Sequence, residues 1–287
     1  MGFKHFLNDV MSGRRKVKDL PNFFEEYFKF KSIQKLSEPV IETKYGTKMF
    51  INKNDEVISK SLVLNKVWEY GESEFFKKLI TKGMNIIDIG ANIGYFSILF
   101  SKLTGDSGKV FSFEPEPNNF QFLLKNIQAN NSSNIIPFNK AVSNYDGKIN
   151  LFLSRSNIGD HRMINFNSDR EVRNRIEIES VKLDTAIPKD QKIDLIKMDI
   201  QGSEMKAIDG MKRILGENNK MVLVTEFWPY AIKQSGYEPE DFFNVLNTYG
   251  FKIYTLEGSS KIPVAKDFKM IHKYSSLDYT NLICEKS

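Results

Sequence analysis

This chain has little cysteine, little histidine and no long apolar run. It contains one cysteine, Cys284, so no internal disulfide can form, and the apolar neighbours of that cysteine favour a core position. No stretch reaches the roughly 18 apolar residues that a membrane-spanning helix needs, and the N-terminus lacks the apolar segment and cleavage site of a signal peptide. We therefore expect a protein without a membrane span in the reducing cytoplasm.

A strong excess of one charge is also missing from most of the chain. The formal net charge is +5, and most of it falls in residues 1–18, where five basic side chains face one acidic side chain. The remainder is nearly neutral, which is not typical of a general polyanion binder. We therefore expect no nucleic-acid partner.

The N-terminal segment predicts a helix of its own. Apolar side chains recur at helical spacing over residues 3–11, and basic residues follow them. Such a helix can cap the main domain or pair with a second subunit, which we favour, or dock on a membrane surface or a carrier protein. We therefore expect this helix to mediate either a homodimer contact or docking on another surface.

The most informative stretch joins a strand, a sharp turn and a helix. The run 86–89 is apolar except for Asp88 and is typical of a buried parallel strand, and glycines then lead into an apolar helix. A second apolar strand, 109–113, ends at Glu114, the position from which a carboxylate binds both hydroxyls of a ribose. The pair predicts an adenosine-containing ligand, whereas the turn alone could merely pack helix on sheet.

The residues of the turn disfavour a dinucleotide. A dinucleotide needs a second glycine that lets the backbone close on its pyrophosphate, and this chain has Asn92 there, preceded by Ala91. S-adenosylmethionine (SAM) carries no phosphate and tolerates side chains at the turn. SAM is therefore the predicted cofactor, in preference to a nicotinamide dinucleotide.

Five motifs in this order resemble those of the FkbM-type SAM-dependent methyltransferases, over roughly residues 60–286. They are Asp88–Gly94, Phe113–Asn119, Ala141–Ser143, Lys197–Glu204 and Glu226–Tyr230. The resemblance implies a Rossmann-like class I methyltransferase fold: an α/β fold with a mostly parallel seven-stranded sheet and helices on both faces. The family-like motif usually has an acidic residue where this chain has Gln201, so no role of that charge is carried over.

We expect two parts in the chain. Residues 1–68 form an N-terminal extension of helices and a β-hairpin, with extended strands over residues 41–64, and residues 69–287 form the SAM-binding methyltransferase domain. Within residues 144–183 we expect strands over 148–153 and 176–183, and the long polar segment 154–174 between them is typical of a lid or substrate loop.

The predicted lid is rich in arginine. Five of the eight arginines of the chain lie between residues 155 and 175, and arginine suits bidentate binding of carboxylate or phosphate. They favour an anionic acceptor, such as a sugar on a nucleotide or lipid carrier. The alternative is that they pair with acidic residues of the same loop.

Acidic residues end four of the predicted parallel strands, and the carboxyl ends of such strands share one crevice. Glu72, in a helix expected over residues 69–80, is a candidate for the ammonium group of SAM. The other cofactor-binding residues that we expect are Asp88, Gly90, Ala91, Asn92, Gly94, Tyr95, Phe96, Glu114, Pro115, Ala141 and Asp199.

Methyl transfer to a hydroxyl requires alignment of the acceptor and removal of its proton. His161 is the first candidate base, because neutral imidazole titrates near physiological pH, and Arg162 lies beside it; a structural role is the alternative. Asp199 is the second candidate. Asp199 and Glu226 end neighbouring strands, so they could act together in catalysis or hold a divalent metal ion.

The predicted function is O-methyl transfer from SAM to a hydroxyl of a glycan, sugar or secondary-metabolite-like acceptor, free or carrier-linked. A nitrogen acceptor in nucleic acid is disfavoured. The Asn/Asp-Pro-Pro-aromatic sequence that receives a flipped base is missing after the fourth predicted parallel strand, residues 194–199. Another small-molecule or nitrogen acceptor and a SAM-binding scaffold without catalysis stay as alternatives.

Overall fold

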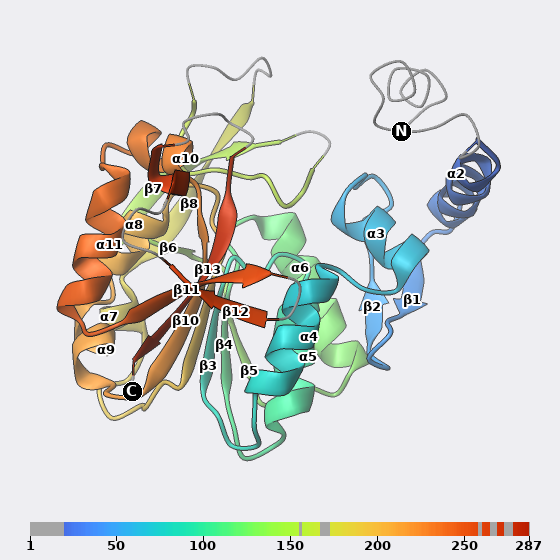
Figure 1. Ribbon diagram of the computed structural model, residues 1–287. Coiled ribbons are helices and arrows are strands. Elements are labelled where there is room, and N and C mark those ends of the chain that lie inside the picture. The colour runs from blue at the N-terminus through green and yellow to red at the C-terminus, as the bar shows by residue number, and fades with distance from the viewer. Residues whose placement is uncertain are drawn as a thin grey trace.

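The computed structural model describes residues 20–154, 157–166, 173–257, 260–264, 269–272 and 278–286. The helix predicted over residues 3–11 lies outside the described residues. Figure 1 shows a central sheet between two groups of helices, with the first described helix at one side of the molecule. None of the described helices is both long enough and apolar enough to cross a membrane.

The central sheet contains eight strands in the described part of the chain, in the order β12-β11-β13-β10-β9-β3-β4-β5. The parallel strands are β5 (Ile135–Phe138), β4 (Val110–Phe113), β3 (Ile86–Ile89), β9 (Leu195–Met198) and β10 (Met221–Phe227). The antiparallel strands are β13 (Thr280–Lys286), β11 (Lys252–Glu257) and β12 (Ser260–Pro263). The predicted α/β class and mostly parallel sheet are confirmed, and β12 adds an edge strand to the seven expected.

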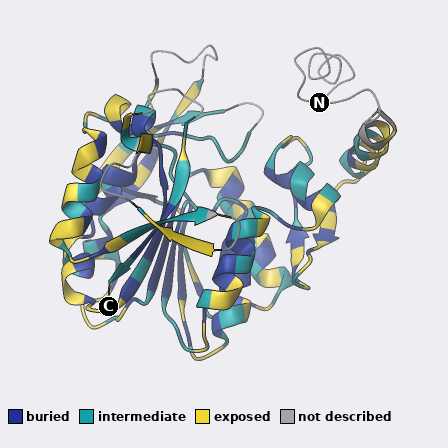
Figure 2. Ribbon diagram, in the orientation of Figure 1, coloured by how far each residue is buried: buried dark blue, intermediate teal, exposed yellow. Residues whose placement is uncertain are grey.

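Helices cover both faces of this sheet, which explains the apolar strands. One face carries α4 (Tyr70–Leu79), α5 (Tyr95–Thr104) and α6 (Pro117–Ala129); the other carries α7 (Leu183–Ala186), α8 (Glu204–Asp209), α9 (Lys212–Glu217), α10 (Pro229–Gln234) and α11 (Pro239–Thr248). Strands β3, β4 and β9 are buried at every residue, and Figure 2 shows these central strands as buried. Both faces of a parallel strand then require apolar side chains.

The sequence prediction for the N-terminal extension is partly wrong. It consists of α2 (Leu20–Gln34), the hairpin β1 (Val40–Glu42) and β2 (Lys48–Phe50), and α3 (Ile58–Asn65). The hairpin is as expected, but α3 is a helix where a strand was predicted up to residue 64. Ile58, Leu62 and Val63 lie on one buried face at helical spacing, and the backbone N–H of Ser59 donates to the buried Asp55 carboxylate at 2.6 Å.

The extension packs directly on the methyltransferase domain. Asn126 of α6 and Asn130, which follows that helix, each donate to a carbonyl and accept from an N–H of strand β2, at 2.6–3.1 Å. These side chains satisfy backbone groups that an edge strand would otherwise expose. Phe30 and Leu62 of the extension also belong to the apolar cluster that contains Phe76 of α4.

A second, three-stranded sheet carries the predicted lid. Its strands are β6 (Ala141–Val142), β8 (Asn174–Val181) and β7 (Gly147–Leu153), in that order. The predicted strands on either side of the long polar segment are therefore confirmed. Residues 157–166 lie between β7 and β8, and residues 157–163 form one wall of the cavity described next.

Candidate active site

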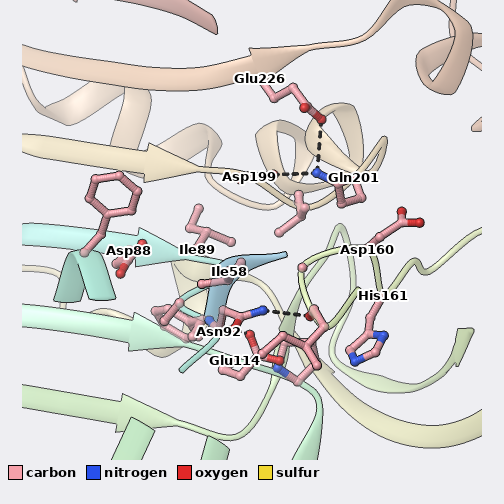
Figure 3. Close-up of a pocket in the computed structure, with 18 of the residues that line it drawn as sticks. Ile58, Asp88, Ile89, Asn92, Glu114, Asp160, His161, Asp199, Gln201 and Glu226 are labelled. Carbon is pink, nitrogen blue, oxygen red and sulfur yellow. Dashed lines mark hydrogen bonds between the residues drawn. The ribbon is translucent and has the colours of Figure 1, made fainter. Parts of the chain in front are cut away.

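A cavity of about 350 Å³ lies at the carboxyl ends of the parallel strands (Figure 3). Open α/β sheets bind their ligands at this edge, and the volume falls in the range of small-molecule sites. Most of the residues predicted from the sequence meet here. The cavity is lined by Asp88, Gly90, Ala91, Asn92, Tyr95, Phe96, Glu114, Pro115, Ala141, His161, Arg162, Asp199 and Glu226.

Two predicted cofactor residues do not line the cavity. Gly94 begins α5 with φ +90°, and a Cβ on it would come 2.6 Å from Leu123 Cδ1, so it serves the packing of α5 on α6. Glu72 is buried and accepts a hydrogen bond from Asn281 of β13. The sequence analysis expected both residues to contact the cofactor, but in the structure neither residue reaches the cavity wall.

Several lining residues were missed by the sequence reasoning. Lys197 carried a signal, because it is a charged residue inside an otherwise apolar strand. Glu69 and Tyr279 gave none, because the fold brings them to the cavity from outside the motif series. The lining residues not predicted include Val57, Ile58, Trp68, Glu69, Ile158, Lys197, Trp228 and Tyr279.

The glycine turn joins the ends of β3 and β9. Gly90 has φ +82°, and a Cβ there would lie 2.1 Å from the carbonyl oxygen of Asp199. Asn92 also has a positive φ, +53°, and its Nδ2 donates to the carbonyl of Ile158 at 2.7 Å. The Asn92 side chain therefore binds the lid at the position where a dinucleotide fold has a bare glycine.

Glu114 is held firmly at the end of β4. One carboxylate oxygen accepts the backbone N–H of Asn92 at 2.8 Å, and the other accepts that of Glu116 at 2.9 Å. Burial raises the pKa of Glu114 to about 8, although both hydrogen bonds act in the opposite direction. The turn and the strand end are thus joined through this carboxylate, beside Pro115 and Ala141.

A buried lysine lies among the acidic groups of the site. Lys197 is 4% exposed; its Nζ lies 3.8 Å from Asp199 Oδ2 and 4.9 Å from the centre of the Phe96 ring. Burial alone would lower the pKa of Lys197, but nearby carboxylates raise it above its ordinary value; they belong to Asp199, Asp88, Glu72 and Glu69. Lys197 therefore stays charged and offsets part of the negative charge of the cavity.

Three carboxyl groups in or next to the cavity have raised pKa values, so they hold their protons more tightly than usual. Burial raises the pKa of Glu69 well above its ordinary value, with further effects from Glu72 and Asp199. Burial raises the pKa of Glu72 to about 7, against the attraction of Lys197. Burial and the neighbouring Asp199 raise the pKa of Glu226 as well. A cation placed in this cavity would favour the ionised form of each group.

Gln201 bridges Asp199 and Glu226. Its Nε2 donates to Asp199 Oδ1 at 2.8 Å and lies 3.4 Å from Glu226 Oε2 (Figure 3). The amide thus occupies the place between the two carboxylates where a metal ion, one of the two alternatives given above for this pair, would bind. Within the described residues, no group of three or more His, Cys, Asp or Glu side chains is arranged to hold a metal ion.

The geometry of His161 does not suit the predicted general base. Its Nδ1 accepts the backbone N–H of Ser154 at 3.1 Å, so the neutral ring carries its proton on Nε2. The lone pair of Nδ1 is engaged and Nε2 is a donor, which leaves the neutral ring without an acceptor for a substrate proton. His161 lines the cavity as a hydrogen-bond donor instead.

Two described arginines of the lid pair with its own Asp160. Arg162 Nε lies 2.5 Å from Asp160 Oδ1, and Arg173 Nη2 lies 2.6 Å from Asp160 Oδ2. The guanidinium of Arg162 also stacks 4.4 Å from the centre of the Phe166 ring. These contacts follow the alternative expected from the sequence and give Arg162 a role in shaping the lid instead of a catalytic one. The remaining lid arginines include Arg155 and Arg170, which lie outside the described residues.

The lid is fastened over the cavity from two sides. The carbonyl of Ile158 accepts from Asn92 and, at 3.1 Å, from Asn119 Nδ2, while its N–H donates to Asp55 Oδ1 at 3.3 Å. The second contact comes from the N-terminal extension, which also places Ile58 in the cavity wall. The extension is therefore part of the site.

The donor set fits SAM. Asp88 Oδ1 is buried without a hydrogen-bond partner among the described residues, and carboxyl groups dominate the end of the cavity near Lys197. Anionic side chains suit a sulfonium and an ammonium group, whereas they would repel phosphates. At the other end, Glu114 and Ala141 frame a space for a ribose and an adenine.

Comparison with known proteins gives three findings. The sequence model of a family described as "Methyltransferase FkbM domain" matches residues 88–253. The ribosomal protein L11 methyltransferase of Thermosipho africanus is 32% identical over 82 residues, which are 29% of this chain and 31% of that protein. This chain thus spans less than a third of that relative.

Two solved structures are similar in fold. Methyltransferase FkbM from Methylobacillus flagellatus has 16% sequence identity and a TM-score of 0.49, and the match covers 93% of this chain and 59% of that chain. TYW2 from M. jannaschii in complex with AdoMet has 14% identity and a TM-score of 0.45, with 88% and 85% covered.

Proposed function

The chain belongs to the FkbM methyltransferase domain family and is a SAM-dependent methyltransferase, and from this premise we propose that its acceptor is a hydroxyl of a glycan, sugar or secondary-metabolite-like molecule. The observation that supports a hydroxyl acceptor is the carboxyl pair of Asp199 and Glu226, bridged by Gln201 in the cavity wall. An alcohol must lose its proton during transfer, so a hydroxyl acceptor needs such a base.

Different parts of the cavity would hold different parts of SAM. The ribose and adenine would lie against Glu114, Pro115 and Ala141, and the cationic methionine end against Glu69 and Asp199. When bound, SAM supplies an electrophilic methyl group on a sulfonium. The residues of this chain have to align the acceptor oxygen with that group, take its proton and exclude water.

Glu226 is the base that we propose. It is 8% exposed and lines the cavity, and its raised pKa makes its carboxylate a stronger base than an ordinary glutamate. The acceptor proton would move to the carboxylate of Glu226 as the acceptor oxygen gains the methyl group. Gln201 positions Glu226 by bridging it to Asp199.

Aromatic side chains support a sugar-like acceptor. Trp68, Trp228 and Tyr279 line the cavity, and flat aromatic faces pack against the apolar faces of sugar rings. The Nε1 of Trp228 is buried without a hydrogen-bond partner among the described residues. A buried donor of this kind ordinarily has a partner, and an acceptor oxygen would supply one.

A methyl-labelled SAM assay tests this proposal. The protein is incubated with labelled SAM and extracts of cell-envelope glycans and small metabolites, and labelled products are identified by mass spectrometry. We expect label in a methyl ether on a hydroxyl, with labelling lost in Glu226→Gln and kept in Glu177→Gln, a matched change at an exposed ion pair with Lys148. Label on an amine or in nucleic acid would contradict the proposal.

A further inference from the structure

Glu69 enters the cavity from outside the matched family region. It precedes α4, lies in the left-handed backbone region with φ +42°, and lines the cavity next to Trp68. The family match begins at residue 88, so the family region does not supply this carboxyl group. Glu69 is therefore a feature that the packing of this chain adds to the cofactor site.

Glu69 is one of a pair of carboxyl groups. Glu72 raises the pKa of Glu69, whereas Glu69 lowers that of Glu72, so Glu69 holds its proton more tightly because of its neighbour. Glu72 also accepts from Asn281 of β13, which fixes the pair from behind. The pair thus presents one carboxyl group, Glu69, to the cavity and keeps the other in the protein interior.

The surroundings of this pair are rich in acidic groups. Among the groups with the largest effects on the pKa of Glu69, Lys197 is a cation and lowers that pKa. Acidic groups that act on Glu69, or on which it acts, come from α4, β9, β10 and α5 and from the segment before β13: Glu72, Asp199, Glu226, Tyr95 and Tyr279. An independent observation at the same cavity is Asp88, 1% exposed, whose Oδ1 has no partner among the described residues. Both features point to a cationic ligand.

We propose that Glu69, with Glu72 behind it, makes this cavity select SAM over S-adenosylhomocysteine, the uncharged-sulfur product of methyl transfer. The two molecules share the adenosine and the amino-acid tail and differ by one methyl group and the positive charge of the sulfonium. A carboxyl group that gives up its proton when the sulfonium binds gains an ion pair that the product cannot make. The product would then leave readily once the charge is gone.

This inference depends on SAM as the cofactor and not on the acceptor. A proton displaced from the pair must appear in solution, so SAM binding should release more protons than product binding. The preference for SAM should grow as the pH rises, because less free energy is then needed to remove the proton.

Calorimetry on the full chain tests the selection. The ligands are SAM, S-adenosylhomocysteine and sinefungin, which carries a protonated amine in place of the methyl sulfonium. We expect SAM and sinefungin to bind about tenfold tighter than S-adenosylhomocysteine, which corresponds to about 1.4 kcal/mol. Titration in two buffers of different ionisation enthalpy should show greater proton release with the two cationic ligands.

Glu69→Gln is the decisive variant. Glutamine keeps the size and polarity of the Glu69 side chain, but it cannot become negatively charged. We expect SAM and sinefungin to lose about tenfold in affinity while S-adenosylhomocysteine changes less than twofold. Glu74→Gln is the matched control, because Glu74 lies on α4, the helix that Glu69 precedes, and binds Lys44 and Tyr45 away from the cavity.

Two results would overturn the inference. One is wild-type protein that binds S-adenosylhomocysteine as tightly as SAM, with equal proton release. The other is a Glu69→Gln protein that loses the same factor for all three ligands. Neither result bears on the proposed hydroxyl acceptor. A labelled amine product would refute that acceptor but would not affect the predicted preference for SAM over S-adenosylhomocysteine.

Discussion

The Cα of Gly90 lies so close to Asp199 that a Cβ would come within 2.1 Å of the Asp199 carbonyl oxygen. This contact fastens the glycine turn of β3 to the end of β9. The turn expected to receive the cofactor and the acidic group expected near its sulfonium are therefore one rigid unit. Changes at either residue should affect cofactor binding and chemistry together.

Gly90→Ala should abolish detectable SAM binding and destabilise the protein. The new methyl group would overlap a backbone oxygen, and the φ of +82° is unfavourable for any residue with a Cβ, with a cost of at least about 1–3 kcal/mol. Urea denaturation and calorimetry measure the two effects. Gly236→Ala is the control: its φ is also positive, but its Cβ would meet no atom within 4 Å. Equal effects of the two changes would contradict the close-contact argument.

Glu114→Ala should weaken SAM binding by about tenfold or more. The change removes the expected ribose ligand and leaves the N–H groups of Asn92 and Glu116 without their acceptor. Both tryptophans of the chain, Trp68 and Trp228, line the cavity, so intrinsic fluorescence reports cofactor binding. An unchanged affinity would show that the ribose lies elsewhere.

Glu226→Gln should lower kcat by about 10²–10⁴-fold, the usual contribution of a general base. His161→Ala should lower it by less than about tenfold, because the neutral His161 ring acts as a donor. Single-turnover rates with saturating labelled SAM separate the two. A loss in His161→Ala as large as that in Glu226→Gln would restore His161 as the base.

The stability of the protein should fall as the pH rises from about 5 to 8. Burial raises the pKa of Glu114 from an ordinary 4.5 to about 8, so the folded state binds a proton that the unfolded state has lost in this range. The stabilisation is complete below the ordinary pKa and is lost as the pH passes the folded pKa. Urea denaturation at several pH values should show this fall, and Glu114→Gln should make it shallower. A stability that rises over this range would contradict the burial of these protonated groups.

Removal of divalent metal should leave the rate unchanged. Gln201 already donates to Asp199 and lies 3.4 Å from Glu226, so this pair has a hydrogen-bond donor where a cation would bind. The measurement is the labelling rate after dialysis against a chelator, with and without added Mg²⁺. Activity lost on chelation and restored by Mg²⁺ would instead support the metal site predicted from the sequence.

Much of the fold follows from local patterns in the sequence. Strands β3, β4 and β9 are buried on both faces, so their apolar runs are continuous and easily recognised. Because acidic residues follow or end these strands, their meeting at one edge could be predicted from the parallel arrangement. Helix α3 could not, because its short apolar run fits a strand as well as a helix.

The charge state of the site needed the tertiary structure. Glu69 and Tyr279 reach the cavity from segments before and after the motif series, and nothing local marks them. The tautomer of His161 depends on one backbone N–H, that of Ser154. The pairing of Arg162 with Asp160, two residues away, was among the alternatives, but only the folded lid decides it.

A crystal structure of the protein with bound sinefungin tests the central claim most directly. The account predicts that the ribose hydroxyls bind the Glu114 carboxylate and that the ligand amine lies between Glu69 and Asp199, under the lid residue Ile158. Sinefungin bound elsewhere, or a Glu114 carboxylate that contacts only Asn92 and Glu116 in the complex, would contradict it.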